Sequence, residues 1–136
     1  MKTVIVDAGA ILALLNADSR IHRQAREMLK ALREREAVPL LTNFIVGETF
    51  TLLSDTLGPD AGRTWLRHNI WPVERVNEAD EKRAREILLE NGGPGGVNIS
   101  YTDAATIAVM ERLGITGIFT FNPVFEERGY SPLPAE

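Results

Sequence analysis

The feature that most constrains the fold is a short run of β-branched residues that stops at a carboxylate. Thr3 to Val6 are all β-branched, Asp7 follows them, and small residues of a helical pattern come next. An apolar run of this length before a helical pattern is typical of a buried strand in a parallel sheet. Ligands of open α/β sheets bind at the carboxyl ends of the strands. Asp7 therefore lies where such a fold carries its chemistry, provided that other polar groups reach the same edge.

The rest of the chain alternates strand and helix patterns, which predicts a parallel sheet with helices on both faces. Apolar runs predict strands at 38–41, 72–76 and 116–120, and a short last strand at 130–133. Helical periodicity and capping residues predict helices at 10–15, 18–34, 42–56, 58–69, 77–90 and 100–114. We therefore expect one α/β domain over residues 1–136, a three-layer α/β/α sandwich with a mostly parallel sheet of about four to five strands.

Composition and motif content exclude several classes of site. The chain has no cysteine, which rules out disulfides and thiolate metal ligands and suits a reducing cytoplasm. No apolar run approaches the roughly 18 residues of a membrane helix, and the N-terminus enters a strand at once, so we expect no signal peptide. The glycine-rich segment 91–96 lacks the Gly-Lys-Ser/Thr ending of a phosphate-binding loop, and we interpret it as a connection.

The charge of the chain bears on nucleic-acid binding. The formal net charge is −4, which argues against a protein that coats nucleic acid through bulk electrostatics but permits an enzyme that contacts a few phosphates. Arg63 and Arg67 are one turn apart in the predicted helix 58–69, with His68 beside them, and are candidates for phosphate contacts. A solvated helix face, or a dimer surface shared with Trp65, is the simpler explanation.

Three acidic residues do not fit the solvated helix faces where most of the others lie. Asp7 ends the first strand, and Glu48 and Asp103 lie on the apolar stripes of their predicted helices. A carboxylate directed at a core is unfavourable unless it is paired, protonated or bound to a metal. Each has a simpler explanation: Asp7 caps the next helix, Asp103 forms a capping box with Ser100, and Glu48 pairs with a buried arginine.

Taken together, the three acids indicate a shared site, because all of them lie at or near helix beginnings that follow strands. In a parallel sheet those ends meet at one edge. Carboxylates without histidine or cysteine suit Mg²⁺ or Mn²⁺ better than zinc. A serine- or cysteine-nucleophile mechanism has little support, since cysteine is absent and His22 and His68 lie in charged segments predicted to be exposed.

The chain resembles the PIN domains, and among them the VapC-like ribonucleases. The similarity runs almost end to end, and the segment around Asp103 is its most specific part. It is carried by the segments 4–10 with Asp7, 18–25 with His22, 41–49 with Glu48, 99–104 with Asp103, and 119–125 followed by Gly129 and Tyr130.

The resemblance implies a metal-dependent endoribonuclease that hydrolyses RNA phosphodiester bonds with Mg²⁺ or Mn²⁺. Asp7, Glu48 and Asp103 would hold the metal, and Thr120 would orient nearby groups. VapC-like proteins are toxins paired with a small antitoxin whose tail plugs the site, and they usually form homodimers. We therefore expect RNA as the substrate, an antitoxin partner, a homodimer, a cytoplasmic location and no membrane association.

Two positions differ from the family pattern. Asn122 stands where the family commonly has a fourth aspartate, and Ala8 where many members have serine or threonine. The Asn122 amide keeps an oxygen that can bind a metal or its water, but it lacks the negative charge of an aspartate, so a second metal is in doubt. The alternative is a catalytically weak PIN module that binds RNA or a protein partner. A haloacid-dehalogenase-like phosphotransferase with Asp7 as nucleophile is disfavoured, because Gly9 replaces the second aspartate of such enzymes.

Overall fold

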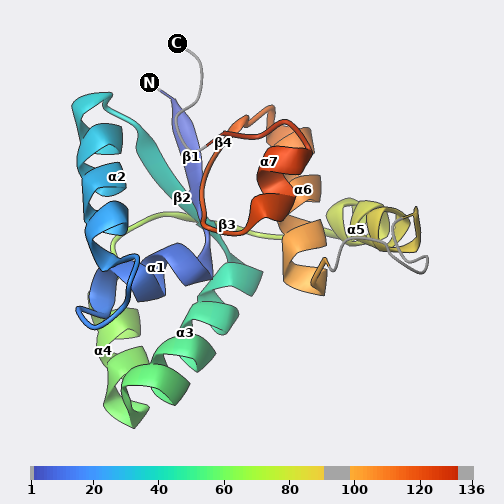
Figure 1. The fold of residues 1–136 in the computed structure, drawn as a ribbon. Helices are drawn as coiled ribbons and strands as arrows, with labels where there is room; N and C mark the ends of the chain where they lie inside the picture. Colours follow the sequence, from blue (N-terminus) through green and yellow to red (C-terminus); the bar gives the residue numbers. More distant parts are fainter. Residues whose placement is uncertain (1, 91–98, 132–136) are drawn as a thin grey trace.

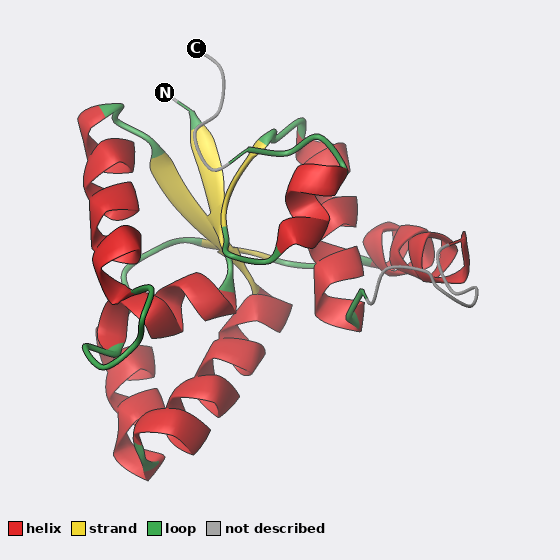
Figure 2. Ribbon diagram, viewed as in Figure 1, coloured by secondary structure: helices red, strands yellow, loops and turns green. Residues whose placement is uncertain are grey.

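The computed structural model describes residues 2–90 and 99–131. Within them the centre is a parallel four-stranded sheet in the order β3-β2-β1-β4 (Figures 1 and 2). Its strands are β1 Thr3–Val6, β2 Val38–Thr42, β3 Val73–Glu74 and β4 Gly117–Phe119. Ile5 of β1 lies beside Leu40 of β2 on one side and Ile118 of β4 on the other. The predicted α/β fold with a parallel sheet is confirmed.

Helices cover the sheet on both sides. In the described ranges they are α1 Ala8–Leu15, α2 His22–Glu34, α3 Asn43–Leu57, α4 Pro59–His68, α5 Glu78–Glu90, α6 Tyr101–Leu113 and α7 Pro123–Glu127. Figure 1 shows α1 and α2 on one side of the sheet and α5, α6 and α7 on the other, while α3 and α4 extend beyond its carboxyl edge. None of the helices described has both the length and the apolar composition needed to cross a membrane.

The core forms around β1, which Asp7 follows directly, and α6, which contains Asp103. Val4, Ile5 and Val6 are each at most 1% exposed, because β1 is flanked by two strands and covered on both faces. Burying one such side chain contributes about 1.5–3 kcal/mol. In α6 every residue from Ala104 to Met110 is buried, as expected for a helical run that is apolar on all sides apart from Thr106. Both acids are therefore anchored by rigid elements.

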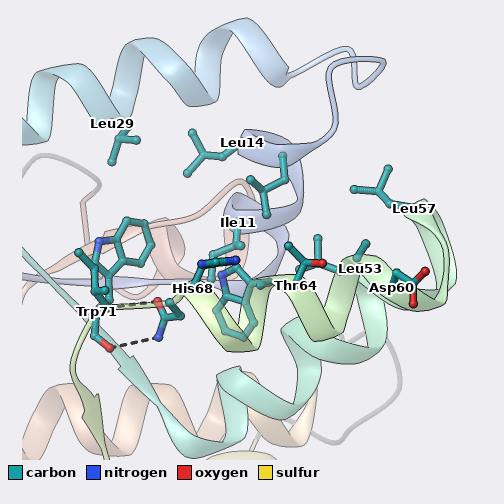
Figure 3. Close-up of a pocket in the computed structure, with 14 residues that line it drawn as sticks. Ile11, Leu14, Leu29, Leu53, Leu57, Asp60, Thr64, His68 and Trp71 are labelled. Carbon is teal, nitrogen blue, oxygen red and sulfur yellow. Dashed lines mark hydrogen bonds between the residues drawn. The ribbon is translucent and has the colours of Figure 1, made fainter.

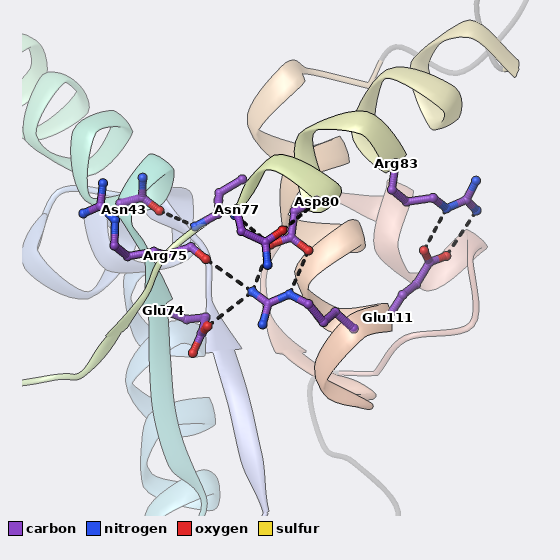
Figure 4. A network of polar contacts seen from close by, with 9 residues as sticks. Asn43, Glu74, Arg75, Asn77, Asp80, Arg83 and Glu111 are labelled. Atoms are coloured by element: carbon purple, nitrogen blue, oxygen red, sulfur yellow. Dashed lines mark hydrogen bonds and ion pairs between the residues drawn. The ribbon is translucent and has the colours of Figure 1, made fainter.

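Arg112, near the end of α6, ties this helix to β3 and α5 through hydrogen bonds to Glu74 and Asp80, which are labelled in Figure 4. Its guanidinium donates to both carboxylate oxygens of Asp80 at 2.9 Å, and to Glu74 and the Arg75 carbonyl at 3.2 Å. Burial raises the pKa of Asp80, but the hydrogen bonds from Arg112 and from the Asn77 backbone lower it below its ordinary value. The network therefore fixes the C-terminal end of α6, whereas Asp103 lies in the first turn of this helix.

The second helix starts later than predicted. Its first residue is His22 rather than residue 18. Asn16 Oδ1 accepts a hydrogen bond from the Asp18 backbone N–H, and Ser19 Oγ accepts one from the Ile21 N–H. Short polar side chains often hold the backbone in turns in this way, in competition with helix. The segment expected to begin the helix is therefore a turn before it.

Two strand predictions need correction. β3 contains two residues instead of the expected run 72–76. At the predicted last strand, 130–133, the described part of the chain contains a single parallel bridge between Gly117 and Ser131. Residues 132 and 133, like the glycine-rich segment 91–96, lie outside the described residues.

Candidate active site

Asp7 stands at the carboxyl end of β1 and acts as the N-cap of α1. Its Oδ1 accepts a hydrogen bond from the Gly9 backbone N–H at 3.0 Å. The simple capping explanation is therefore correct. It is also incomplete, because Oδ2 accepts a hydrogen bond from the Thr120 hydroxyl, which follows the neighbouring strand β4. Asp7 thus has a structural contact through one oxygen and faces a second segment through the other.

Asp103 likewise combines a cap with a longer-range contact. Ser100 Oγ accepts a hydrogen bond from the Asp103 N–H at 3.0 Å, and Asp103 Oδ2 accepts one from the Ser100 N–H at 3.3 Å. The predicted capping box of α6 is therefore present. The same Oδ2 also accepts a hydrogen bond from Asn122 Nδ2 at 3.1 Å. This contact brings the segment after β4 against the beginning of α6.

Thr120 and Asn122 connect these two acids. Thr120 Oγ1 accepts a hydrogen bond from the Asn122 N–H at 3.0 Å while donating to Asp7, so a chain of hydrogen bonds runs from Asp7 to Asp103. Asn122 Oδ1 accepts a hydrogen bond from the Val124 N–H at 3.1 Å and caps α7. This cap fixes the amide orientation, because a reversed amide would point its NH₂ at that N–H. The Asn122 oxygen is thus directed at α7 and the NH₂ at Asp103.

Glu48 approaches the same edge from α3, which begins directly after β2. It is half-buried, and burial is the main reason that its pKa is raised. The negative charges of Asp7 and Asp103 raise the pKa further, and a hydrogen bond from Thr102 opposes the shift. The alternative explanation for Glu48, a buried arginine partner, is not found among the ion pairs of the described residues.

The pKa of Asp7 is raised for related reasons. Burial is the largest cause, the hydrogen bonds from Thr120 and Gly9 oppose it, and the charge of Asp103 adds to it. Asp7, Glu48 and Asp103 therefore repel one another across the carboxyl edge of the sheet, and none of the ion pairs of the described residues includes one of them. A site of this kind is stabilised by a positively charged ligand.

The donors at this edge are carboxylate and hydroxyl oxygens, which is the chemistry of a Mg²⁺ or Mn²⁺ site. As the side chains stand, no three acidic, histidine or cysteine residues among those described are grouped closely enough to hold an ion. Asp7 and Asp103 are held by helix caps, so gathering three carboxylates around one ion requires side-chain rotation, chiefly by Glu48. The assignment of Asp7, Glu48 and Asp103 as metal ligands stays a prediction.

Two features of the site were not found in the sequence. Helix α7 was missed, although an asparagine cap followed by proline at the first helical position is a common helix start, as at Asn122 and Pro123. The contact of Thr102 with Glu48 was also missed. Thr102 is adjacent to Asp103, but the contact joins two helices far apart in sequence, and no local pattern predicts it.

The family of the chain follows from its match to known sequences. The family model of the PIN domain matches residues 4–129. This chain belongs to the PIN domain family. It is also similar to the 23S rRNA-specific endonuclease VapC20 from two strains of Mycobacterium tuberculosis, with 29% identity over 130 residues that cover 93% of this chain and 95% of the relative. The similarity places this PIN domain with the VapC-like toxin nucleases.

Solved structures agree with this placement. The crystal structure of Mycobacterium tuberculosis VapC20, a sarcin–ricin loop cleaving toxin, superposes with a TM-score of 0.80 at 28% identity and covers 96% of this chain and 98% of its own. A toxin–antitoxin complex from Klebsiella pneumoniae gives a TM-score of 0.63 at 14% identity, covering 88% of this PIN domain and 87% of that chain. The second likeness concerns the fold alone.

The predicted basic candidates of the PIN domain lie on other surfaces. Arg63 pairs with Asp60 at 3.5 Å across one turn of α4, and both side chains are exposed, which favours the solvated-face explanation. His68 is exposed, as predicted. His22 is not: it is half-buried, and its Nδ1 lies 2.7 Å from the Ala13 carbonyl, where it links α2 to α1.

A large apolar groove lies away from the three acids. It has a volume of about 700 Å³ and runs between α1, α2, α3 and α4 (Figure 3). Leucines of α1, α2 and α3 line it together with Trp65 and Trp71, and Ile70 on its border is 91% exposed. Its lining contains one carboxylate, Asp60, and none of the predicted metal ligands. The groove has the character of a protein-binding surface rather than of a site for hydrolysis.

Proposed function

We propose that this PIN domain is a divalent-metal-dependent endoribonuclease that hydrolyses RNA phosphodiester bonds. The observation that carries the proposal is electrostatic. Asp7, Glu48 and Asp103 come from three different segments, and none of them has an ion-pair partner among the described residues. The charge of Asp103 raises the pKa of Asp7, and the charges of Asp7 and Asp103 raise the pKa of Glu48. When bound, Mg²⁺ or Mn²⁺ would neutralise charge on a phosphoryl group and make a coordinated water more acidic.

The residues of the chain would hold this site in shape. Asp7, Glu48 and Asp103 would hold the ion through carboxylate oxygens. The hydroxyl of Thr120 donates to Asp7 Oδ2 while Oδ1 keeps the cap of α1, and the amide of Asn122 donates to the same Asp103 oxygen that completes the capping box. In this scheme the three acids are the catalytic residues, and Thr120 and Asn122 position their carboxylates.

Cleavage of RNA in the presence of Mg²⁺ or Mn²⁺ tests the proposal. The panel should contain single-stranded RNA, structured RNA and a 23S rRNA fragment, since the relative VapC20 is specific for 23S rRNA. We expect cleavage that stops with EDTA and falls at least about 100-fold in Asp7→Asn and Glu48→Gln. Glu27→Gln, an exposed acid on α2, is the matched control. Cleavage that is unaffected by either substitution at the acids would contradict the proposal.

A second candidate function is an RNA- or protein-binding module with weak catalysis. The amide of Asn122 favours it, because this residue contributes no negative charge and directs its NH₂ at Asp103. If this alternative holds, the wild-type protein will bind RNA of the same panel and leave the RNA intact at millimolar Mn²⁺.

We further propose that the chain is a single domain that forms homodimers and is neutralised by a small antitoxin. An apolar groove of this kind accepts the apolar face of a helix, and such a helix from the antitoxin is its proposed occupant. The test is co-purification with the product of an adjacent small reading frame. Ile70→Ser should weaken the complex at least about tenfold. Leu89→Ser, which is 84% exposed on α5, is the control and should have no effect.

A further inference from the structure

A second hollow lies directly beside Glu48, on the outer face of α3. It has a volume of about 520 Å³ and includes Glu48 itself in its lining. The rest of the lining is uncharged: Asn43, Phe44, Gly47, Thr51, Leu52 and Thr102. We propose that this hollow, called here the base shelf, receives an unpaired nucleobase of the RNA whose phosphate lies at the carboxylates. The inference rests on the proposed function and names the form of RNA that the site accepts.

Gly47 supplies the first argument for a ligand. It lies inside α3, where glycine is less favourable than alanine by about 1 kcal/mol. Glycine in a helix usually permits close approach of a neighbouring element, yet a Cβ built on Gly47 meets no atom within 4 Å. The packing of the described protein therefore does not require glycine here. A side chain at this position would instead occupy the base shelf beside Glu48.

Two aromatic rings supply the second argument. Phe44, one turn before Glu48 on the same face of α3, has its ring centroid 6.0 Å from that of Tyr101, with the planes inclined by 33°. Phe44 packs against the core, whereas Tyr101 is 42% exposed. Tyr101 precedes Thr102 and Asp103 at the start of α6. The aromatic pair therefore joins two of the acid-bearing segments. The Phe44 ring lines the base shelf and offers a face for stacking, and the exposed Tyr101 ring lies beside it at the border.

The chemistry of the base shelf selects its occupant. Its lining is neutral except for Glu48, so a phosphate has no counter-charge there, whereas a flat uncharged ring can stack on the Phe44 ring and contact threonine and asparagine groups. Bases within a duplex are stacked on both faces and do not present a free face to such a ring. Unpaired or splayed bases do, and proteins commonly recognise RNA through them.

The test measures binding separately from cleavage. A short single-stranded RNA containing 2-aminopurine is titrated with protein in Ca²⁺, its integrity is checked on a gel, and the same sequence as a duplex serves as competitor. We expect quenching by the wild type and weak competition by the duplex. Gly47→Leu should fill the base shelf and weaken binding about tenfold, as should Tyr101→Leu, while Tyr101→Phe should bind as wild type. Thr56→Leu, an exposed position further along α3, is the control.

Stability measurements separate this role from a structural one. Gly47→Leu should melt at the wild-type temperature or above it, because the substitution raises helix propensity in open space. Unchanged RNA affinity of Gly47→Leu in a protein that still cleaves RNA would overturn the base shelf and leave the proposed function standing. A change of oligomeric mass in Gly47→Leu, with affinity per subunit unchanged, would overturn it in favour of a second copy of the chain. Absence of both binding and cleavage by wild type would overturn the proposed function itself.

Discussion

Replacing Asn122 by aspartate should destabilise the metal-free protein and make it more dependent on a divalent cation. Asn122 Nδ2 donates to Asp103 Oδ2 across 3.1 Å, and in Asn122→Asp that donor becomes a carboxylate oxygen. The α7 cap would survive, since a carboxylate oxygen also accepts from the Val124 N–H. The substitution therefore changes charge at an almost constant shape, next to Asp103.

The size of the effect follows from this geometry. Two negative charges about 3 Å apart repel by about 5 kcal/mol at an effective dielectric constant of about 20. Protonating one of the two carboxyls limits the loss, because this takes about 4 kcal/mol at pH 7 for a pKa near 4. Side-chain rotation reduces it further, since both groups reach solvent. We expect a net loss of about 2–4 kcal/mol, which corresponds to a decrease of roughly 6–15 °C in Tm for a chain of this size.

Thermal melting in EDTA across pH gives the decisive measurement. The carboxyl pair of Asn122→Asp has a raised pKa in the folded state, so its penalty is absent below about pH 4 and appears as the pH rises through that pKa. Millimolar Mn²⁺ should restore stability and shift Tm more in Asn122→Asp than in wild type. Asn16→Asp, which keeps its turn hydrogen bond to the Asp18 N–H, is the control. A variant as stable as wild type in EDTA at pH 7 would refute the role assigned to the Asn122 amide.

Three further outcomes are expected. Glu48→Gln should raise the Tm of the metal-free protein at pH 7 by a few degrees and have no effect near pH 4. The raised pKa of Glu48 means that its negative charge, once formed, destabilises the folded state. A lower Tm at pH 7 would contradict this. Millimolar Mn²⁺ should stabilise wild type by about 2–3 kcal/mol at 100 times its Kd, and Asp103→Asn should lose most of that gain; an unchanged gain would remove Asp103 from the site. Arg112→Met should reduce the free energy of unfolding by about 2–4 kcal/mol, because it leaves the buried Asp80 without its partner. Arg83→Met, whose partner Glu111 is exposed, should lose less than about 1 kcal/mol in the same denaturant titration.

The sequence was informative where local pattern and fold agree. The β-branched run before Asp7 predicted the central strand, and the strand–helix alternation predicted the parallel sheet at whose carboxyl edge Asp7 lies. The boundary of α2 was missed because the side-chain oxygens of Asn16 and Ser19 accept hydrogen bonds from nearby backbone N–H groups, and such bonds are as compatible with a turn as with a helix start. The orientation of the Asn122 amide was beyond the sequence, since it depends on a helix cap and on Asp103, nineteen residues away.

The dual use of the acids has an evolutionary consequence. Asp7 caps α1 and Asp103 completes the capping box of α6, so selection for a stable fold is enough to retain both. Glu48 has no capping duty, and its burial beside two other negative charges works against stability. In a lineage that abandoned phosphodiester hydrolysis, the two caps would persist while the glutamate drifted to a neutral residue. Among descendants of this fold, the residue aligned with Glu48 is therefore the better marker of retained nuclease activity.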